Sequence, residues 1–347
     1  MSEALLFVAG AVLAWALVFG MRQWAPRLRL LDVPNERSIH KDPTPLGGGA
    51  AIVAVTAAGI AVAAAFGTRP EWPAFAGYLA GALLIAAMSL LDDFHALPAG
   101  PRLAAQFVSA ALMVLGLASQ PGFLLSPVPA ALGWVIALIW TVGLTNAYNF
   151  MDGVDGLAAT QGLVAGLGWA ARAALDHVPW LSLLGLLLAA ACAGFLVHNW
   201  SPAKIFMGDA GSAFLGFTFA FMTLALLHRS PQVALVGALM LWPFLFDTLF
   251  TMIRRARRGE NLLVAHHSHL YQRLVLAGWR HTSVTVLYGF LSLITLGIGI
   301  AWLVTAAAAA AFFLIATSLL LPLALWLLVV RAERQVGRAP SHSPHKA

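Results

Sequence analysis

Carboxylates stand at the ends of apolar runs in this sequence. Asp92 and Asp93 follow a leucine pair directly, and Asp209 closes the short string IFMGD. Adjacent carboxylates repel each other and lose hydration on burial, so a divalent cation or a proton usually compensates for them. As a structural alternative, Asp209 could simply cap the helix that follows it. Capping explains the 92–93 pair poorly, because helix C-termini disfavour anions. We therefore expect a site for a cation or a proton.

Amides and carboxylates recur at every third position in a second segment, at Asn146, Asn149, Asp152 and Asp155. Residues three apart share one face of a helix. Two amides and two carboxylates at one edge of an apolar run are typical of a ligand-binding set. An Asx turn would account for Asp155 and the glycine after it, but not for the other three.

Basic and aromatic residues in other loops are suited to a phosphorylated nucleotide. Lys41 precedes three glycines at 47–49, a stretch whose backbone can approach an anion closely. Lys204 offers a second cation for phosphate. Phe206 offers a ring face on which a base can stack.

Three histidines, His266, His267 and His269, lie just before Arg273. They suit either zinc or a pyrophosphate. Zinc spacing is only partly met and no cysteine is near, because the single cysteine lies in an apolar run. We favour a phosphate and sugar clamp. Asp247, inside another apolar run, is either functional or the partner of a basic loop residue.

Long apolar helices must position these residues. The chain has 347 residues, of which 61% are hydrophobic and only 10% charged, and its mean hydropathy is +0.84. A soluble domain carries about a quarter charged residues. Apolar runs lie at 4–21, 48–66, 74–91, 102–119, 130–149, 156–174, 180–198, 210–228, 232–253, 282–304 and 307–330. Runs of this length span a bilayer as helices. The sequence therefore predicts an all-α, polytopic bundle of about 11 spans.

Charge sets the orientation of this bundle. All 20 Lys and Arg residues except Arg69, Arg172 and Arg229 fall on one side, together with the polar loops. That side is predicted to be cytoplasmic, with the N-terminus outside and the C-terminus inside. The pI of about 10.1 needs no nucleic acid, because basic loops sit well against anionic membrane lipids. We expect one integral membrane catalytic domain over 1–331 and a disordered cytoplasmic tail over 332–347.

Five strings, in order along the chain, carry a resemblance: PNERSIHKDPTPLGGG (34–49), LLDDF (90–94), NAYNFMDGVDGLA (146–158), IFMGDAGS (205–212) and HHSHLYQRL (266–274). Together they resemble the polyprenyl-phosphate N-acetylhexosamine-1-phosphate transferase family, glycosyltransferase family 4, and its O-antigen-initiating subgroup most of all. The resemblance implies a bacterial inner-membrane enzyme with a cytoplasmic active site. It would transfer N-acetylhexosamine-1-phosphate from a UDP-sugar to undecaprenyl phosphate, release UMP, use Mg²⁺ (or Mn²⁺ as a substitute), and initiate a cell-envelope glycan such as the O-antigen of lipopolysaccharide.

The matched positions imply roles. Those implied to be catalytic are Asp92, Asp93, Asp152, His266 and His269. Asp209 and Asp152 are the implied metal ligands. The implied substrate contacts are Lys41, Asn149, Gly153, Val154, Asp155, Lys204, Phe206 and Arg273. The chain departs from some relatives at Ala96, where they carry Asp or Asn, and at Ser268, where they carry His.

Several alternatives stay open at this level. Asp92 deprotonates the lipid phosphate, or an aspartate attacks first and forms a covalent intermediate. The rival functions are a transporter or lipid flippase, which would place ionisable residues near the midplane, and a channel with an acidic ring. Carboxylates on one membrane face favour the enzyme. The sugar and the oligomeric state, a homodimer included, are not specified.

Overall fold

The structure is a computed structural model that describes residues 2–28, 30–32, 43–65, 70–95, 97–120, 129–227, 232–262, 264, 266–305 and 308–338. The helices are α1 (Glu3–Trp24), α2 (Gly49–Ala65), α3 (Trp72–His95), α4 (Ala99–Leu117), α5 (Ala130–Phe150), α6 (Leu157–Leu175), α7 (Pro179–Asn199), α8 (Asp209–Leu227), α9 (Gln232–Met240), α10 (Trp242–Arg257), α11 (Leu270–Leu276), α12 (His281–Thr305) and α13 (Ala308–Arg338). Strands β1 (Leu31–Asp32) and β2 (Thr44–Pro45) form one short antiparallel pair.

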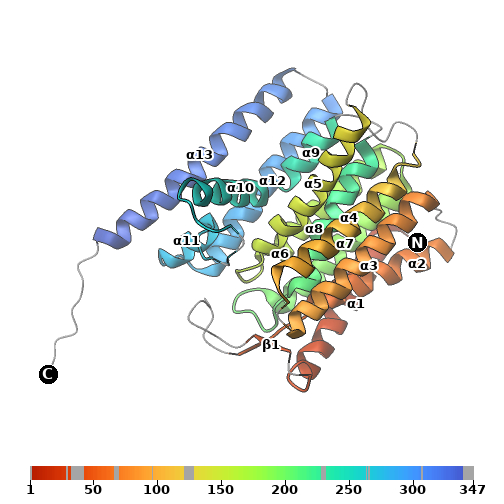
Figure 1. Cartoon of the computed structure of the whole chain (residues 1–347), viewed down its shortest axis with the longest axis horizontal. Coiled ribbons are helices and arrows are strands. Elements are labelled where there is room, and N and C mark those ends of the chain that lie inside the picture. Colours follow the sequence, from red (N-terminus) through yellow and green to blue (C-terminus); the bar gives the residue numbers. More distant parts are fainter. Residues whose placement is uncertain are drawn as a thin grey trace.

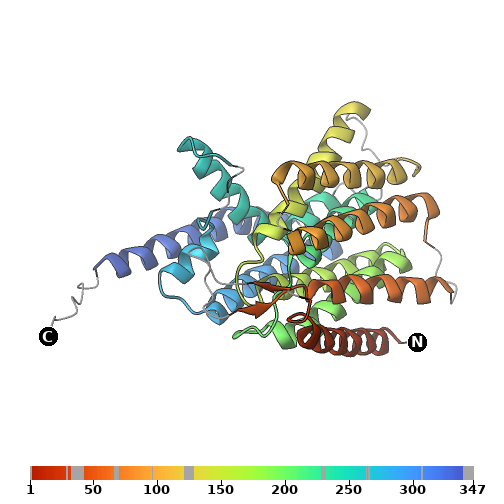
Figure 2. The ribbon, with the colours of Figure 1, turned by 60° about the horizontal axis from the view of Figure 1, so that its bottom comes forward.

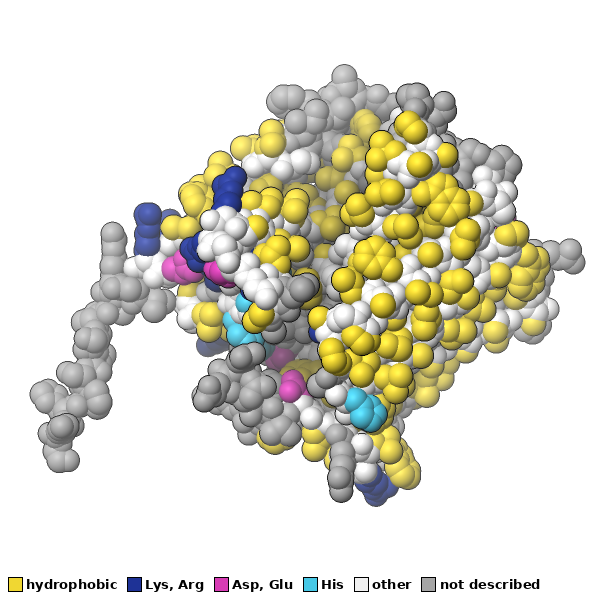
Figure 3. Space-filling model, in the orientation of Figure 1, with side chains coloured by type: hydrophobic (Ala, Val, Ile, Leu, Met, Phe, Trp, Pro, Cys, Tyr) yellow, Lys and Arg dark blue, Asp and Glu magenta, His cyan; other side chains and the backbone are white. Residues whose placement is uncertain are grey.

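The helical, membrane-spanning character predicted from the sequence is confirmed. Within the described residues, eight helices are long and apolar enough to cross a membrane by length and composition: α1, α3, α4, α5, α7, α8, α12 and part of α13. Hydrophobic side chains cover most of the visible bundle surface, whereas charged and histidine side chains gather toward one end (Figure 3). The total of eleven spans and their orientation stay predictions.

The predicted run 232–253 is not one helix. It divides into α9 and α10, with Leu241 between them. Pro243 has no N–H and lies in the first turn of α10, so a continuous helix would lose a hydrogen bond there. The Gln161 side chain of α6 donates to the Met240 carbonyl oxygen at 2.7 Å, so this carbonyl at the break has a hydrogen-bond partner. As a result α10 projects away from the main bundle (Figure 2).

Helix α8 forms the centre of the bundle. Its residues from Ala210 to Leu226 are all buried, as expected for a helix that is apolar on every side. It packs against α2, α3 and α5 (Figure 1). Because α8 is enclosed along its length, Asp209 at its first position is held by a rigid element.

Two of the glycines at 47–49 allow close packing at the start of α2. A Cβ on Gly49 would lie 2.3 Å from the Gly211 Cα, so only glycine allows α2 to begin against α8. The Gly48 and Gly49 N–H groups donate to the carbonyl oxygens of Phe206 and Met207 at 2.9 and 2.8 Å. The first loop is thereby joined to the loop before α8.

The tail prediction is wrong in part, because α13 continues to Arg338 and residues 332–338 are helical. Ala332 is buried, and Arg273 of α11 makes a two-bond ion pair with Glu333 at 2.7 Å. These contacts hold the extension. Residues 339–347 lie outside the described residues.

Candidate active site

Asp92 and Arg102 join the end of α3 to the start of α4. The Asp92 carboxylate accepts the Leu97 N–H at 2.6 Å and an Arg102 N–H at 2.8 Å. The same guanidinium lies 3.6 Å from Asp209. Arg102 therefore bridges two carboxylates that the sequence places over a hundred residues apart.

Asp93 faces a different helix. Its carboxylate accepts the Asp209 N–H at 2.8 Å and the Ala210 N–H at 3.3 Å, two of the unpaired donors at the start of α8. The negative charge also interacts favourably with the helix N-terminus. Gly208, the residue before α8, has φ +77°. A Cβ on Gly208 would lie 2.7 Å from an Asp93 oxygen. The structure thus adds a positioning role to the catalytic role predicted for Asp93.

Asn149 connects the second polar segment to Asp209. Its amide donates to Asp209 at 2.9 Å and to the Ser212 hydroxyl at 3.0 Å. Asn146, one turn earlier on α5, instead exchanges two hydrogen bonds with Gln106 of α4, at 2.6 and 3.1 Å. The predicted helical face covers only the two amides, because α5 ends at Phe150 before Asp152 and Asp155. Even these two amides serve different partners.

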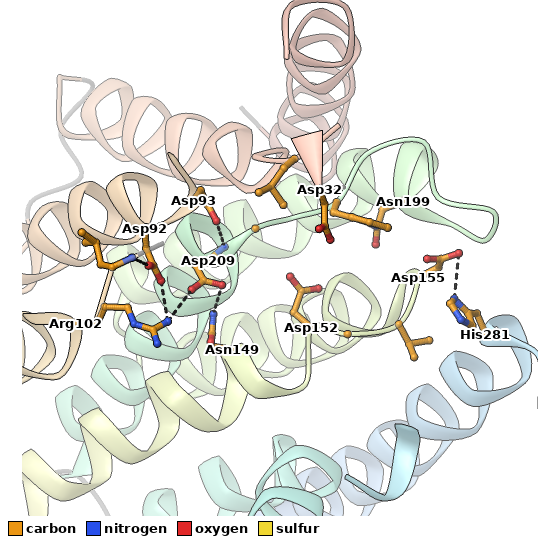
Figure 4. A pocket seen from close by; sticks show the side chains of 16 residues that line it. Asp32, Asp92, Asp93, Arg102, Asn149, Asp152, Asp155, Asn199, Asp209 and His281 are labelled. Carbon is orange, nitrogen blue, oxygen red and sulfur yellow. Dashed lines mark hydrogen bonds and ion pairs between the residues drawn. The ribbon is translucent and has the colours of Figure 1, made fainter. Parts of the chain in front are cut away.

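Asp152 lies between two ends of the site (Figure 4). Asp92, Arg102 and Asp209 form one end, and Asp155 and His281 form the other. Burial raises its pKa well above the usual range, and the nearby charges of Asp209, Asp93 and Asp155 raise it further. Ionised Asp152 therefore lacks sufficient positive charge around it, which is the condition under which a carboxylate takes up a proton or a cation.

The opposite end of the site is built from the loops after α5 and α7. The Asp155 carboxylate accepts the Ala203 N–H at 3.1 Å and pairs with His281 at 3.3 Å. Burial alone would raise the Asp155 pKa, but His281, Ser201 and Ala203 outweigh burial and lower it. This carboxylate is ionised at neutral pH.

Asn199 fixes these two loops to each other. Its carbonyl oxygen accepts the Gly156 N–H at 2.9 Å, and its amide donates to the Ile205 carbonyl at 2.9 Å. Phe206 follows directly, and its own N–H donates to the Pro45 carbonyl at 2.8 Å. The Phe206 ring is therefore carried on a backbone held from two sides.

The two ends belong to one pocket of about 480 Å³. Of the residues predicted to form the site, it contains Asp92, Asp93, Asn149, Asp152, Gly153, Val154, Asp155, Phe206 and Asp209. Sequence reasoning missed Asp32, Arg102, Asn199 and His281, which also line it. Each of the four stands at or near the end of a helix or strand on the predicted loop side, a signal that could have identified them.

Four predicted residues do not line this pocket. Lys204 is exposed, and Arg273 is paired with Glu333. His269 is buried at the start of α11 with its ring 4.9 Å from that of His266. Burial, then the neighbouring His269 and Arg255, lower the His266 pKa to about 4.

The predicted Lys41 lies outside the described residues, as does Ala96, one of the two departures from relatives. The other departure, Ser268, donates from its hydroxyl and its N–H to the His266 ring at 3.0 and 3.3 Å. Serine at this position therefore orients a histidine instead of adding one.

The charge of the pocket suits a divalent cation. In the described part of the chain, no three Asp, Glu, His or Cys side chains are close enough to hold a metal by themselves. Mg²⁺ needs fewer, since it binds through one or two carboxylates together with substrate phosphates. Asp152, whose ionised form lacks compensation, and Asp209 are the residues that fit this requirement.

Comparison with known proteins shows which family the chain resembles. Residues 75–227 match Glycosyl transferase family 4. The chain is 34% identical over 278 residues to a probable undecaprenyl-phosphate N-acetylglucosaminyl 1-phosphate transferase of Bacillus subtilis, covering 77% of this chain and 76% of the relative. It is 31% identical over 338 residues to a decaprenyl-phosphate N-acetylglucosaminephosphotransferase of Mycolicibacterium smegmatis, covering 85% and 80%. It is also 31% identical over 326 residues to a phospho-N-acetylmuramoyl-pentapeptide-transferase of Synechococcus, covering 85% and 89%.

Proposed function

The chain belongs to the polyprenyl-phosphate N-acetylhexosamine-1-phosphate transferase family, and we propose that it transfers N-acetylhexosamine-1-phosphate from a UDP-sugar to undecaprenyl phosphate. UMP leaves, and the sugar remains on the lipid through a pyrophosphate. The observation that supports this best is the two-ended pocket. Asp92, Asp209 and Arg102 occupy one end, and Asn199, Asp155 and His281 surround the other. Phe206 also lines the pocket and directly follows Ile205, whose carbonyl accepts from the Asn199 amide.

The second end suits a uracil base. Phe206 offers an aromatic face, and the ionised Asp155 carboxylate can accept a hydrogen bond from a ring N–H. Gly153 and Val154 line the same pocket. A nucleotide with its base here directs its phosphates toward Asp152 and Asp209.

The first end suits the two phosphates that react. An oxygen of the lipid phosphate attacks the sugar-bearing phosphorus of the UDP-sugar, and the bond from that phosphorus to the UMP oxygen breaks. Both reactants are anionic, so Arg102 offsets part of their repulsion. Mg²⁺ bound by Asp209 and Asp152 would offset more.

Asp92 is the base in the direct mechanism. It lies in the pocket beside Arg102 and accepts two hydrogen bonds that fix its orientation. In the covalent alternative an aspartate attacks the sugar-bearing phosphorus first, and the lipid phosphate then displaces it. Burst kinetics of UMP release without lipid would favour the covalent route.

We propose the bacterial inner membrane as the location, with the pocket on the cytoplasmic face and a cell-envelope glycan of the O-antigen type as the pathway served. UDP-N-acetylglucosamine is the first donor to test, because two of the relatives above are named for N-acetylglucosamine.

The decisive experiment incubates the purified protein with undecaprenyl phosphate, Mg²⁺ and a panel of UDP-sugars. We expect UMP release that depends on the lipid, and a lipid product whose mass adds one hexosamine phosphate. Glu3→Gln, which removes an exposed carboxylate in the first turn of α1, is the control and should retain activity. Absence of UMP with every donor would contradict the proposal and favour the alternative function, a transporter or lipid flippase.

A further inference from the structure

Asp247 of α10 is a fully buried carboxylate outside the pocket. A charge within an apolar bundle is costly unless it is paired or hydrogen-bonded. Here its two oxygens accept from the Leu270 N–H at 2.7 Å, the Tyr271 N–H at 3.0 Å, the Tyr288 hydroxyl at 2.7 Å, the Thr251 hydroxyl at 3.2 Å and the His269 ring at 3.3 Å. Five donors thus converge on one carboxylate, which indicates that Asp247 fixes the elements that carry these donors relative to one another.

The first element that it fixes is the start of α11. The N–H groups in the first turn of a helix have no partner within the helix. Asp247 takes those of Leu270 and Tyr271, the first two residues of α11. It also holds His269, the residue just before them. The position of α11 therefore depends on one side chain of α10.

Tyr271 carries this position to the pocket loop. Its side chain is buried, and its hydroxyl donates to the Phe150 carbonyl at 3.0 Å, at the last residue of α5. A Cβ added to Gly153 would lie 2.3 Å from the Tyr271 hydroxyl oxygen, so the tyrosine lies directly behind the loop. Asp152 to Asp155 form the pocket side of that same loop.

We propose that Asp247 and Tyr271 form a strut that holds the 151–156 loop in the conformation that binds the nucleotide. Both are positioning residues, because neither lines the pocket. The strut itself rests on geometry alone. Its effect on the nucleotide rests on the proposed function.

Hydrogen–deuterium exchange tests the strut without any substrate. Tyr271→Phe keeps the ring and removes only the hydroxyl. Loss of one neutral hydrogen bond predicts about fivefold faster exchange in a peptide covering 151–156. Tyr78→Phe is the matched control, because that buried hydroxyl bonds Thr218 of α8 and lies outside both the strut and the polar pocket. It should leave this peptide unchanged.

Asp247→Asn tests the origin of the strut. It should speed exchange both at 269–274 and at 151–156, whereas Tyr271→Phe should affect only the second segment. If Asp247→Asn does not fold, the tyrosine variant still decides. Unchanged exchange at 151–156 in folded Tyr271→Phe overturns the strut.

Kinetics test the link to the nucleotide. Tyr271→Phe should raise the KM for the UDP-sugar about fivefold and leave the KM for undecaprenyl phosphate within about twofold of wild type. Faster exchange with an unchanged UDP-sugar KM overturns the link. A wild-type protein with no UDP-sugar turnover contradicts the proposed function instead, and the exchange experiment still judges the strut.

Discussion

Replacing Phe206 by alanine tests the base-binding end of the pocket with little disturbance elsewhere. The backbone on both sides of the ring is held by hydrogen bonds that do not use the side chain. They join the Phe206 N–H to Pro45 at 2.8 Å, the Gly48 N–H to Phe206 at 2.9 Å and the Asn199 amide to Ile205 at 2.9 Å. The loop should therefore keep its course when the ring is removed.

The expected loss follows from stacking. An aromatic ring stacked on a base contributes about 1–3 kcal/mol, which corresponds to about a 5- to 150-fold rise in the KM for the UDP-sugar. The KM for undecaprenyl phosphate should stay within about twofold, because the proposed site of that substrate is the acidic end near Arg102. Initial rates of UMP release, with each substrate varied in turn, measure both constants. Inhibition by added UMP should weaken by the same factor as UDP-sugar binding.

Two further variants separate stacking from simple bulk. Phe206→Leu keeps an apolar side chain and should resemble the alanine variant, whereas Phe206→Trp should retain most of the affinity. A leucine variant as good as wild type would mean that the ring only fills space. Equal increases in both KM values would mean that Phe206 anchors the loop in the membrane interface.

The remaining predictions concern the carboxylates, the cation, the histidines and the loop glycine. Asp92→Asn and Asp209→Asn should each lower turnover at least about a hundredfold, about 3 kcal/mol of barrier, while the protein stays monodisperse on gel filtration; near-normal rates at saturating Mg²⁺ would remove the role assigned. Because burial and neighbouring carboxylates raise the pKa of Asp152, protons compete with a cation for this carboxylate as pH is lowered. The apparent Mg²⁺ affinity should therefore fall, by up to about tenfold per pH unit, and Asp152→Asn should flatten this dependence; EDTA should stop the reaction and added Mg²⁺ restore it. His266→Ala and His269→Ala should lower activity and His267→Ala less so, and metal analysis that finds stoichiometric zinc would contradict the clamp. Gly153→Ala, whose Cβ would press on the Tyr271 hydroxyl, should weaken UDP-sugar binding, and Tyr271→Phe in the same chain should restore part of it; simple additivity of the two losses would contradict that contact.

Hydrophobic run length was sufficient to predict most of the helices, because a segment that must bury its backbone in lipid has to be helical. It failed at 232–253. There the composition stays apolar, and Pro243 with the Gln161 amide decides that the helix breaks. Run length also could not place the end of α13, since residues 332–338 are helical through contacts with α11 rather than through hydrophobicity.

In the site, too, residues in short motifs could be predicted from the sequence, whereas partners from distant parts of the chain could not. Motif spacing located Asp152 and Asp209 because each stands in a short characteristic string. Arg102 appeared in the sequence only as one more basic residue at a loop edge, and its two carboxylate partners become visible only once α3, α4 and α8 meet. Arg273 is predicted to contact the substrate, and the sequence gives no sign of its ion-pair partner Glu333, which lies 60 residues further along the chain.

The acidic pair shows most clearly what adjacency in sequence means in this fold. Successive residues on a helix point about 100° apart, so Asp92 and Asp93 face different neighbours at the end of α3. Asp92 takes Arg102 of α4, and Asp93 takes the first N–H groups of α8. Two neighbouring carboxylates thereby bring a guanidinium and the Asp209 carboxylate within 3.6 Å of each other. An insertion of one residue between them would rotate one partner away, so the pair must be contiguous for a cation and an anion from separate helices to meet in one pocket.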